Sequence, residues 1–235
     1  MAALQARRLA AGGYAVLQPD LLGCGDSSGD FGDATWNDWV LDVVEAAHWL
    51  NGRHPGPLWL WGLRGGALLC SAASRQLPEA PSLAFWQPVT SGRQVLQQFL
   101  RVKATSQMLE GGAKGVVDAL HRELANGQTV QVAGYWLHPA MASGLQAANL
   151  APPATTDCRV EWFELQSGVA GKLSPAAAHS ALAWQQAGAQ LRTHVVSGPA
   201  FWQTTEIELA PALLDATCAA LQAPQPEAST HTTAP

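Results

Sequence analysis

The stretch LWLWGLRGGALLCSAASRQL (58–77) joins a short apolar run to an apolar helical segment through a glycine-rich turn. LWLWG at 58–62 is apolar throughout, as expected for a parallel strand covered on both faces. The pattern G-x-R-x-G occupies 62–66, and ALLCSAASRQL at 67–77 contains no helix breaker. This order predicts a strand, a tight corner with Arg64 at its tip, and a helix.

Strands and helices alternate on both sides of this corner. Further strands are predicted at 14–17, 82–86, 159–165 and 191–196, and helices at 2–11, 36–52, 175–188 and 205–221. Strands that alternate with helices over this length predict an α/β fold, with a mostly parallel sheet flanked by helices.

One region departs from the alternation and divides the chain. Helical stretches near 92–104 and 113–125 and a strand at 128–133 end in a proline-rich segment, which we interpret as an inserted cap. The predicted division is 1–90 for the first part of the core, 91–155 for the cap, 156–222 for the second part of the core, and 223–235 for a disordered tail. The tail has too little apolar content to order.

Composition excludes several classes of protein. The 235 residues carry a net charge of −5 and only 13% are charged, so no basic field exists for nucleic acid. No run of about 18 apolar residues predicts a membrane span, and the first residues lack the pattern of a secretory signal. The four cysteines are far apart in the sequence. We expect a cytoplasmic protein with free thiols, no metal and no cofactor.

A second motif leads to a family resemblance. DLLGCGDSSGDF (20–31) fits D-x-x-G-x-G-x-S-x-G, the loop after the fourth strand of α/β-hydrolases. Together with LWGLRGGALL, QVAGYWLHPA and VSGPAFWQTTEIELAPALL, it makes the chain resemble the exosortase A system-associated hydrolase 2 family. The resemblance implies an α/β-hydrolase-like fold and a hydrolase of esters, thioesters or amides. It also implies a link to exopolysaccharide production and PEP-CTERM protein sorting.

The positions that the resemblance assigns to a catalytic triad lack triad residues. The elbow position of G-x-S-x-G holds Arg64, whose guanidinium stays protonated and cannot attack. The acid position holds Gly171 and the histidine position holds Ala200. We therefore expect a weakly active or inactive pseudoenzyme, with Gly65 N–H as an oxyanion donor.

The start of the chain carries a further expectation. In the family's sheet, a strand lies between the predicted strand at 14–17 and the strand before the corner, and this chain starts after it. The missing segment also carries the second oxyanion donor. We expect either a true start upstream of Met1 or an incomplete, poorly soluble sheet with exposed strand edges.

Arg64 is the central candidate for ligand binding. A fixed cation at a helix N-terminus suits a carboxylate or phosphate. The structural alternative is an ion pair with an acidic side chain, either Asp26, Asp30 or Glu164. Further candidate ligand contacts are Cys24, Asp26, Ser27, Trp136, His138 and Trp202.

Two functions remain open from these residues. One is a cleft that binds a small anionic or acyl molecule. The other is a non-catalytic scaffold that pairs with a second, sister hydrolase of the same pathway. For Ser27 the structural alternative is hydrogen bonding within its own turn.

Overall fold

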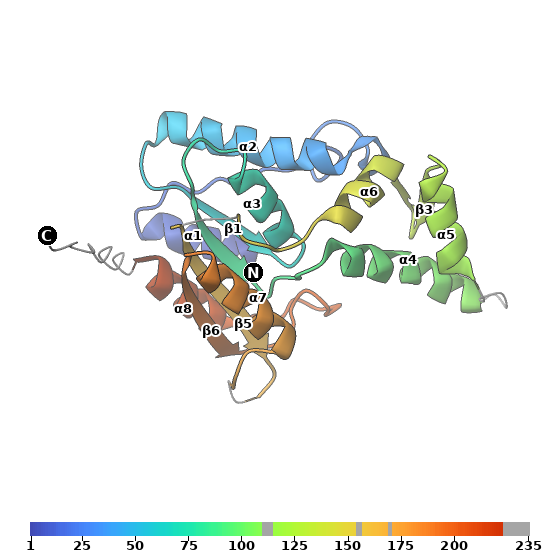
Figure 1. The fold of residues 1–235 in the computed structure, drawn as a ribbon. Helices are drawn as coiled ribbons and strands as arrows, with labels where there is room; N and C mark the ends of the chain where they lie inside the picture. Colours follow the sequence, from blue (N-terminus) through green and yellow to red (C-terminus); the bar gives the residue numbers. More distant parts are fainter. Residues whose placement is uncertain (110–114, 154–156, 169–170, 223–235) are drawn as a thin grey trace, which may run out of the picture.

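The computed structural model describes residues 1–109, 115–153, 157–168 and 171–222, and these form a four-stranded parallel sheet with helices on both faces (Figure 1). The strand order is β1-β2-β5-β6. The strands are β1 (Trp59–Leu63), β2 (Ser82–Trp86), β5 (Arg159–Gln166) and β6 (Gln190–Ser197). The predicted α/β class with a mostly parallel, helix-flanked sheet is therefore confirmed.

The helices cover the two faces of the sheet separately. One face carries α2 (Trp36–Arg53), α3 (Gly66–Ser74) and α7 (Pro175–Gln186), and the other carries α1 (Ala2–Ala11) and α8 (Pro211–Gln222). Consecutive residues of β2 show the division, because Phe85 packs with α3 and α7 whereas Trp86 packs with α8. Both are fully buried, so the sheet forms the centre of a three-layer core.

The segment between β2 and β5 corresponds to the predicted cap, and we use that word for it. It contains α4 (Gly92–Leu109), α5 (Val116–Ala125), the antiparallel hairpin of β3 (Val130–Val132) and β4 (Tyr135–Leu137), and α6 (Pro139–Ala147). Figure 1 shows α4, α5 and β3 projecting to one side of the sheet. The cap has a separate apolar cluster, which also contains the partly buried Phe31 of the short helix η1 (Phe31–Asp33). The sequence did not predict β4 or α6.

The predicted strand at 14–17 is wrong. These residues belong to no helix, strand or turn, and the backbone of 15–19 makes no hydrogen bond to other backbone groups within the described part of the chain. A strand needs a hydrogen-bonded neighbour, and among the described strands β1 pairs with β2 alone. The apolar composition of 14–17 does not supply that neighbour.

The predicted start of the last helix is also wrong. The sequence placed it at 205–221, but α8 begins at Pro211. Proline has no N–H and its ring fixes φ, so it fits the first helical position better than an interior one. Upstream, the Thr204 hydroxyl donates to the Glu206 carbonyl and forms a turn instead.

Two further predictions concern membrane spans and the C-terminal tail. None of their helices is long and apolar enough to cross a membrane. The predicted disordered tail, 223–235, lies outside them.

Candidate functional site

The corner after β1 is strained at its tip, as the sequence predicts. Arg64 has φ +54°, in the left-handed region that residues with a side chain rarely adopt. Its backbone N–H donates to the carbonyl of Trp86 at 2.9 Å, which ties the tip to the end of β2. The chain then enters α3 directly, so Arg64 lies at the carboxyl edge of the sheet and beside a helix N-terminus.

The two flanking glycines have different roles. A Cβ at Gly62 would lie 2.5 Å from the backbone nitrogen of Ala67, so only glycine allows β1 and α3 to approach this closely. A Cβ at Gly66 would meet nothing within 4 Å. The close approach of strand and helix therefore requires glycine at position 62 but not at position 66.

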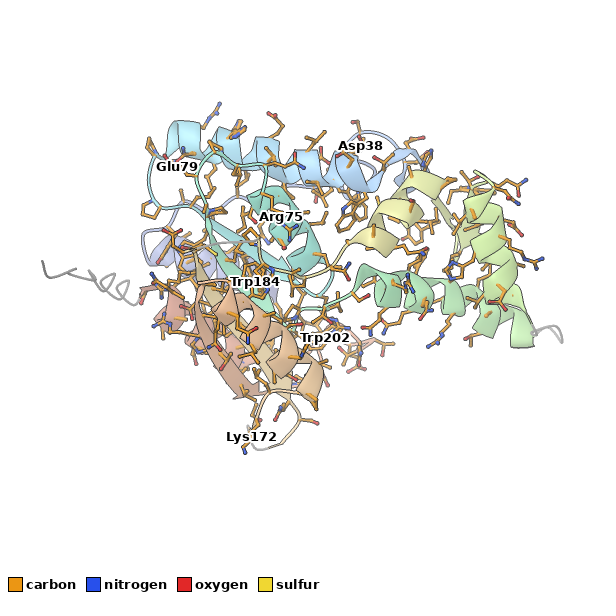
Figure 2. All side chains as sticks on the ribbon, viewed as in Figure 1. Asp38, Arg75, Glu79, Lys172, Trp184 and Trp202 are labelled. Carbon is orange, nitrogen blue, oxygen red and sulfur yellow. The ribbon has the colours of Figure 1, made fainter. Side chains whose placement is uncertain are left out.

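The Arg64 side chain has one hydrogen-bond acceptor and one aromatic neighbour. Its Nη1 donates to the carbonyl oxygen of Gln87 at 3.3 Å, and its Cζ lies 5.4 Å from the ring centroid of Trp202. Figure 2 labels Trp202 near the junction of the sheet with α4 of the cap. Among the described residues, no carboxylate forms an ion pair with Arg64.

The predicted structural alternative, an ion pair of Arg64 with Asp26, Asp30 or Glu164, is therefore wrong. Glu164 is buried and instead accepts hydrogen bonds from the backbone N–H of Ser174, at 3.2 and 3.0 Å. The backbone N–H groups of Asp26 and Asp30 donate within their own loop.

The electrostatics of the corner suit an anion. Burial lowers the pKa of the Arg64 guanidinium from its ordinary value, but an arginine remains charged near neutral pH. Within the described ranges, the N–H groups of Gly65 and Gly66 donate to no protein acceptor. A half-buried cation without a carboxylate thus lies beside two free donors at the N-terminus of α3.

Sequence reasoning missed Gln87. This residue follows the end of β2 and has φ +42°, and its backbone N–H donates to the Phe163 carbonyl at 2.7 Å. Its side-chain Oε1 accepts from Leu165 N–H at 2.6 Å, which turns its own carbonyl oxygen toward Arg64. The Gln-Pro pair after an apolar strand signals a turn, but it does not indicate which side chain the turn contacts.

The glycine-rich loop at 20–31 is held together internally. The Ser27 hydroxyl donates to the Leu21 carbonyl, and it accepts from Cys24 N–H at 3.3 Å. Asp20 accepts from Asp26 N–H at 3.0 Å. Burial, followed by the charges of Asp20 and Asp42, raises the pKa of the Cys24 thiol. These contacts are those of a turn, and no hydrogen bond joins the loop to Arg64 in the described chain.

The two cap residues singled out by sequence lie beside η1 and at the start of α6. Trp136 is 52% exposed on β4, and its Cβ lies against Gly32. His138 caps α6, because its Nδ1 accepts from Ala140 N–H at 3.0 Å. Of the candidate ligand contacts, Trp202 is the side chain that the structure brings to Arg64.

The positions assigned to acid and histidine provide no catalytic group. Gly171 donates its N–H to Gln166 Oε1 at 3.1 Å, and Ala200 lies after β6. Within the described residues, the one histidine bonded to a carboxylate is His194, with Glu161 at 2.6 Å. That pair is accompanied by two arginines and no hydroxyl, so it forms no nucleophilic triad.

No cluster of metal ligands occurs in the described parts of the chain. Arg64 does not line the cavities of about 720, 430 and 330 Å³ found in the described parts of the chain. Its guanidinium is half-buried beside Trp202.

Comparison with known proteins gives only distant similarity. No family model matches the chain, and no curated protein matches significantly. A structure titled RedJ with a PEG molecule in the active site has 16% identity, covers 88% of this chain and 76% of that chain, and gives a TM-score of 0.49. A structure of metagenome-derived lipolytic enzymes, titled LipS and LipT, has 16% sequence identity. The match covers 83% of this chain and 77% of that chain, with a TM-score of 0.49.

A lipase-esterase related protein from Clostridium acetobutylicum has 14% identity, covers 86% of this chain and 80% of that chain, and gives a TM-score of 0.45. Because the sequence identities and TM-scores are this low, the fold class rests on the sheet topology and on the geometry of the corner. Substrates are not transferred from these structures.

Proposed function

We propose that this chain is an α/β-hydrolase-fold protein that binds a small anionic or acyl ligand at Arg64 and lacks triad chemistry. The observation that carries the proposal is the half-buried Arg64 cation, which has no carboxylate partner among the described residues. Arginine binds a carboxylate through two parallel hydrogen bonds, and desolvation strengthens the attraction.

The positions of the neighbouring groups support a carboxylate with an apolar tail. The free N–H groups of Gly65 and Gly66 add donors for the anionic end. Trp202 offers an aromatic face beside the guanidinium. The link to exopolysaccharide and PEP-CTERM exosortase systems rests on the sequence resemblance alone.

The test compares two arginine variants of the same kind. Arg64→Gln removes the cation at the corner, whereas Arg53→Gln removes an arginine stacked on Trp49, 3.9 Å from the ring centroid. Melting temperatures are measured with octanoate, with inorganic phosphate and with uncharged octanamide. At about one hundred times its Kd, octanoate should raise the Tm of the parent chain and of Arg53→Gln by roughly 5–10 °C.

The expected result for Arg64→Gln is no shift with octanoate. An equal shift in both variants, or an equal shift with octanamide, would contradict binding of the anionic end at Arg64. A phosphate shift without an octanoate shift would restrict the ligand to the anion itself. Hydrolysis of p-nitrophenyl butyrate above background by the parent chain, lost in Arg64→Gln, would contradict the absence of catalysis.

A further inference from the structure

A cavity of about 430 Å³ lies within the cap, between α4, α5 and α6 (Figure 1). The lining residues of each helix are spaced by three or four positions, so each helix directs one face to the cavity. Among these residues are Arg93 and Leu96 of α4, His121 and Leu124 of α5, and Ala142 and Gln146 of α6. Arg64 does not line this cavity, so the site is separate from the corner after β1.

Contacts at both ends of α6 fix the helices around the cavity. At the start of the helix, His138 Nδ1 accepts from the N–H of Ala140 at 3.0 Å. At its end, the N–H of Gly92 in α4 donates to the Ala148 carbonyl at 2.9 Å. A Cβ at Gly92 would collide with the Leu145 carbonyl, so only glycine lets α4 and α6 approach this closely. The cavity is therefore a preformed space between packed helices, as is usual for sites that bind small molecules.

The floor of the cavity is apolar. Leu96, Leu124 and Ala142 are buried and belong to the apolar cluster of the cap. The cavity therefore ends on packed side chains. An apolar part of a ligand would leave water on entering it, which is the main driving force for burying such a group.

The polar side chains of the lining can all donate hydrogen bonds, and they come from all three helices. They are Arg93 of α4, His121 of α5, and Ser143 and Gln146 of α6. Within the described chain, none of these four side chains forms a hydrogen bond or an ion pair with another residue. Arg93 carries a fixed positive charge, and no carboxylate lines the cavity. The acidic residues of α5, Asp118 and Glu123, lie outside the lining.

These properties define the chemistry of a ligand. Donors on three sides suit a phosphate group, which has three strong acceptor oxygens, better than a carboxylate, which has two. Arginine binds phosphate through parallel hydrogen bonds. The apolar floor requires an apolar group on the remaining phosphate oxygen. The volume of about 430 Å³ lies near the lower end of the range of about 300–1,000 Å³ for small-molecule sites, so that group is compact.

We propose that this cavity binds a phosphate monoester of a compact apolar group, with the phosphate at Arg93 and the apolar group against Leu96 and Leu124. The site is a second binding site of the chain and is independent of a ligand at Arg64. Because the ligand contacts three helices at once, its binding also stabilises the packing of the cap.

The experiment follows the methyl resonances of the full chain by NMR during titration with 2-naphthyl phosphate. The ring current of a bound naphthalene should shift the methyl resonances of Leu96 and Leu124, whereas that of Leu182, exposed on α7, should stay in place. The comparison probes are 2-naphthol, 2-naphthoate and inorganic phosphate. Each lacks one part of the ligand, so each should have a Kd at least about ten times higher than that of 2-naphthyl phosphate.

Two pairs of variants locate the bound probe. Arg93→Gln should raise its Kd about tenfold or more, whereas Arg101→Gln changes an exposed arginine of α4 outside the lining and should leave the Kd nearly unchanged. Ser143→Trp places a large ring in the cavity from an exposed position and should block binding. Ala140→Trp adds the same ring to α6 outside the lining and should not.

Several results would overturn the proposal. An equal Kd for 2-naphthol would mean that the cavity does not select a charge, and an equal Kd for 2-naphthoate would mean that it does not select phosphate. Unchanged affinity in Arg93→Gln, or methyl resonances of Leu96 and Leu124 that do not move at saturation, would place the probe elsewhere. Binding that is lost in Arg64→Gln but kept in Arg93→Gln would contradict a site in the cap and support the anion site at the corner.

Discussion

The molecule holds arginines in two contrasting environments. Arg159 and Arg192 surround the buried carboxylate of Glu161, with N to Oε1 distances of 2.7 and 2.5 Å, and both also donate to the carbonyl of Ala220. Among the described residues, Arg64 has only a long hydrogen bond to a carbonyl and an indole ring. The first environment provides each charge with a partner within the fold, whereas the second leaves room for a ligand. The predictions below test that difference.

The largest effect is expected from Glu161→Gln. This change removes the countercharge of Arg159, whose side chain is 4% exposed, and a buried ion without its partner costs about 3–5 kcal/mol. Urea unfolding should show a loss of that size. Glu45→Gln, on the exposed side of α2, is the matched control and should change stability by less than about 0.5 kcal/mol. A loss below about 1 kcal/mol for Glu161→Gln would mean that the arginines beside Glu161 do not depend on it for a countercharge.

Acid pH should weaken the same cluster. Burial alone would raise the pKa of Glu161, but hydrogen bonds from His194, Arg192 and Arg159 outweigh it, so the pKa lies below the usual 4.5. A carboxyl with a lowered pKa stabilises the fold above its unfolded-state pKa and loses that contribution as pH falls through its folded-state pKa. Stability should therefore fall below about pH 4.5, measured as urea midpoints. Glu161→Gln should lack that part of the decline.

Substitution of the glycines tests how the corner holds Arg64. Gly62→Ala places a Cβ 2.5 Å from the Ala67 nitrogen and should destabilise the chain by roughly 1–3 kcal/mol. Gly66→Ala meets nothing within 4 Å and replaces a glycine at the start of a helix, so its effect should be neutral or stabilising by up to about 1 kcal/mol. Equal losses in thermal unfolding would mean that the close approach is not specific to Gly62.

The smallest effect on stability is expected from Arg64→Gln. Loss of a 3.3 Å hydrogen bond and an indole contact is offset by removal of a half-buried charge, so the change should stay within about 1 kcal/mol. Urea unfolding should show this small change together with the loss of the octanoate shift described above. A loss comparable to that of Glu161→Gln would show that Arg64 has a structural role.

The sequence predicted the parts of the fold that depend on local pattern. Continuous apolar runs located β1 and β2, the alternation of strands with helices located β5 and β6, and the G-x-R-x-G turn located the strained tip at Arg64. The same criteria failed at 14–17, because strand formation depends on a neighbour in space. They also failed at the start of α8, where Pro211 marked the boundary.

The site itself was less predictable. The contact between Arg64 and Gln87 depends on how the ends of β1 and β2 meet, which no spacing in the sequence gives. The Glu161 cluster had a signal in the sequence, since Arg159, Glu161 and Glu164 lie within the predicted strand at 159–165. Its meaning depends on the register of β5 with β6, which places Arg192 beside Glu161.

Because the ring of Trp202 lies beside Arg64, this tryptophan can serve as a spectroscopic probe of the corner. The chain contains ten tryptophans, so total fluorescence would average a local change away. Incorporation of 5-fluorotryptophan would replace that average with separate ¹⁹F resonances. An anion that settles on the Arg64 guanidinium should move the resonance of Trp202, whereas Trp49, beside Arg53, provides an internal reference that stays in place.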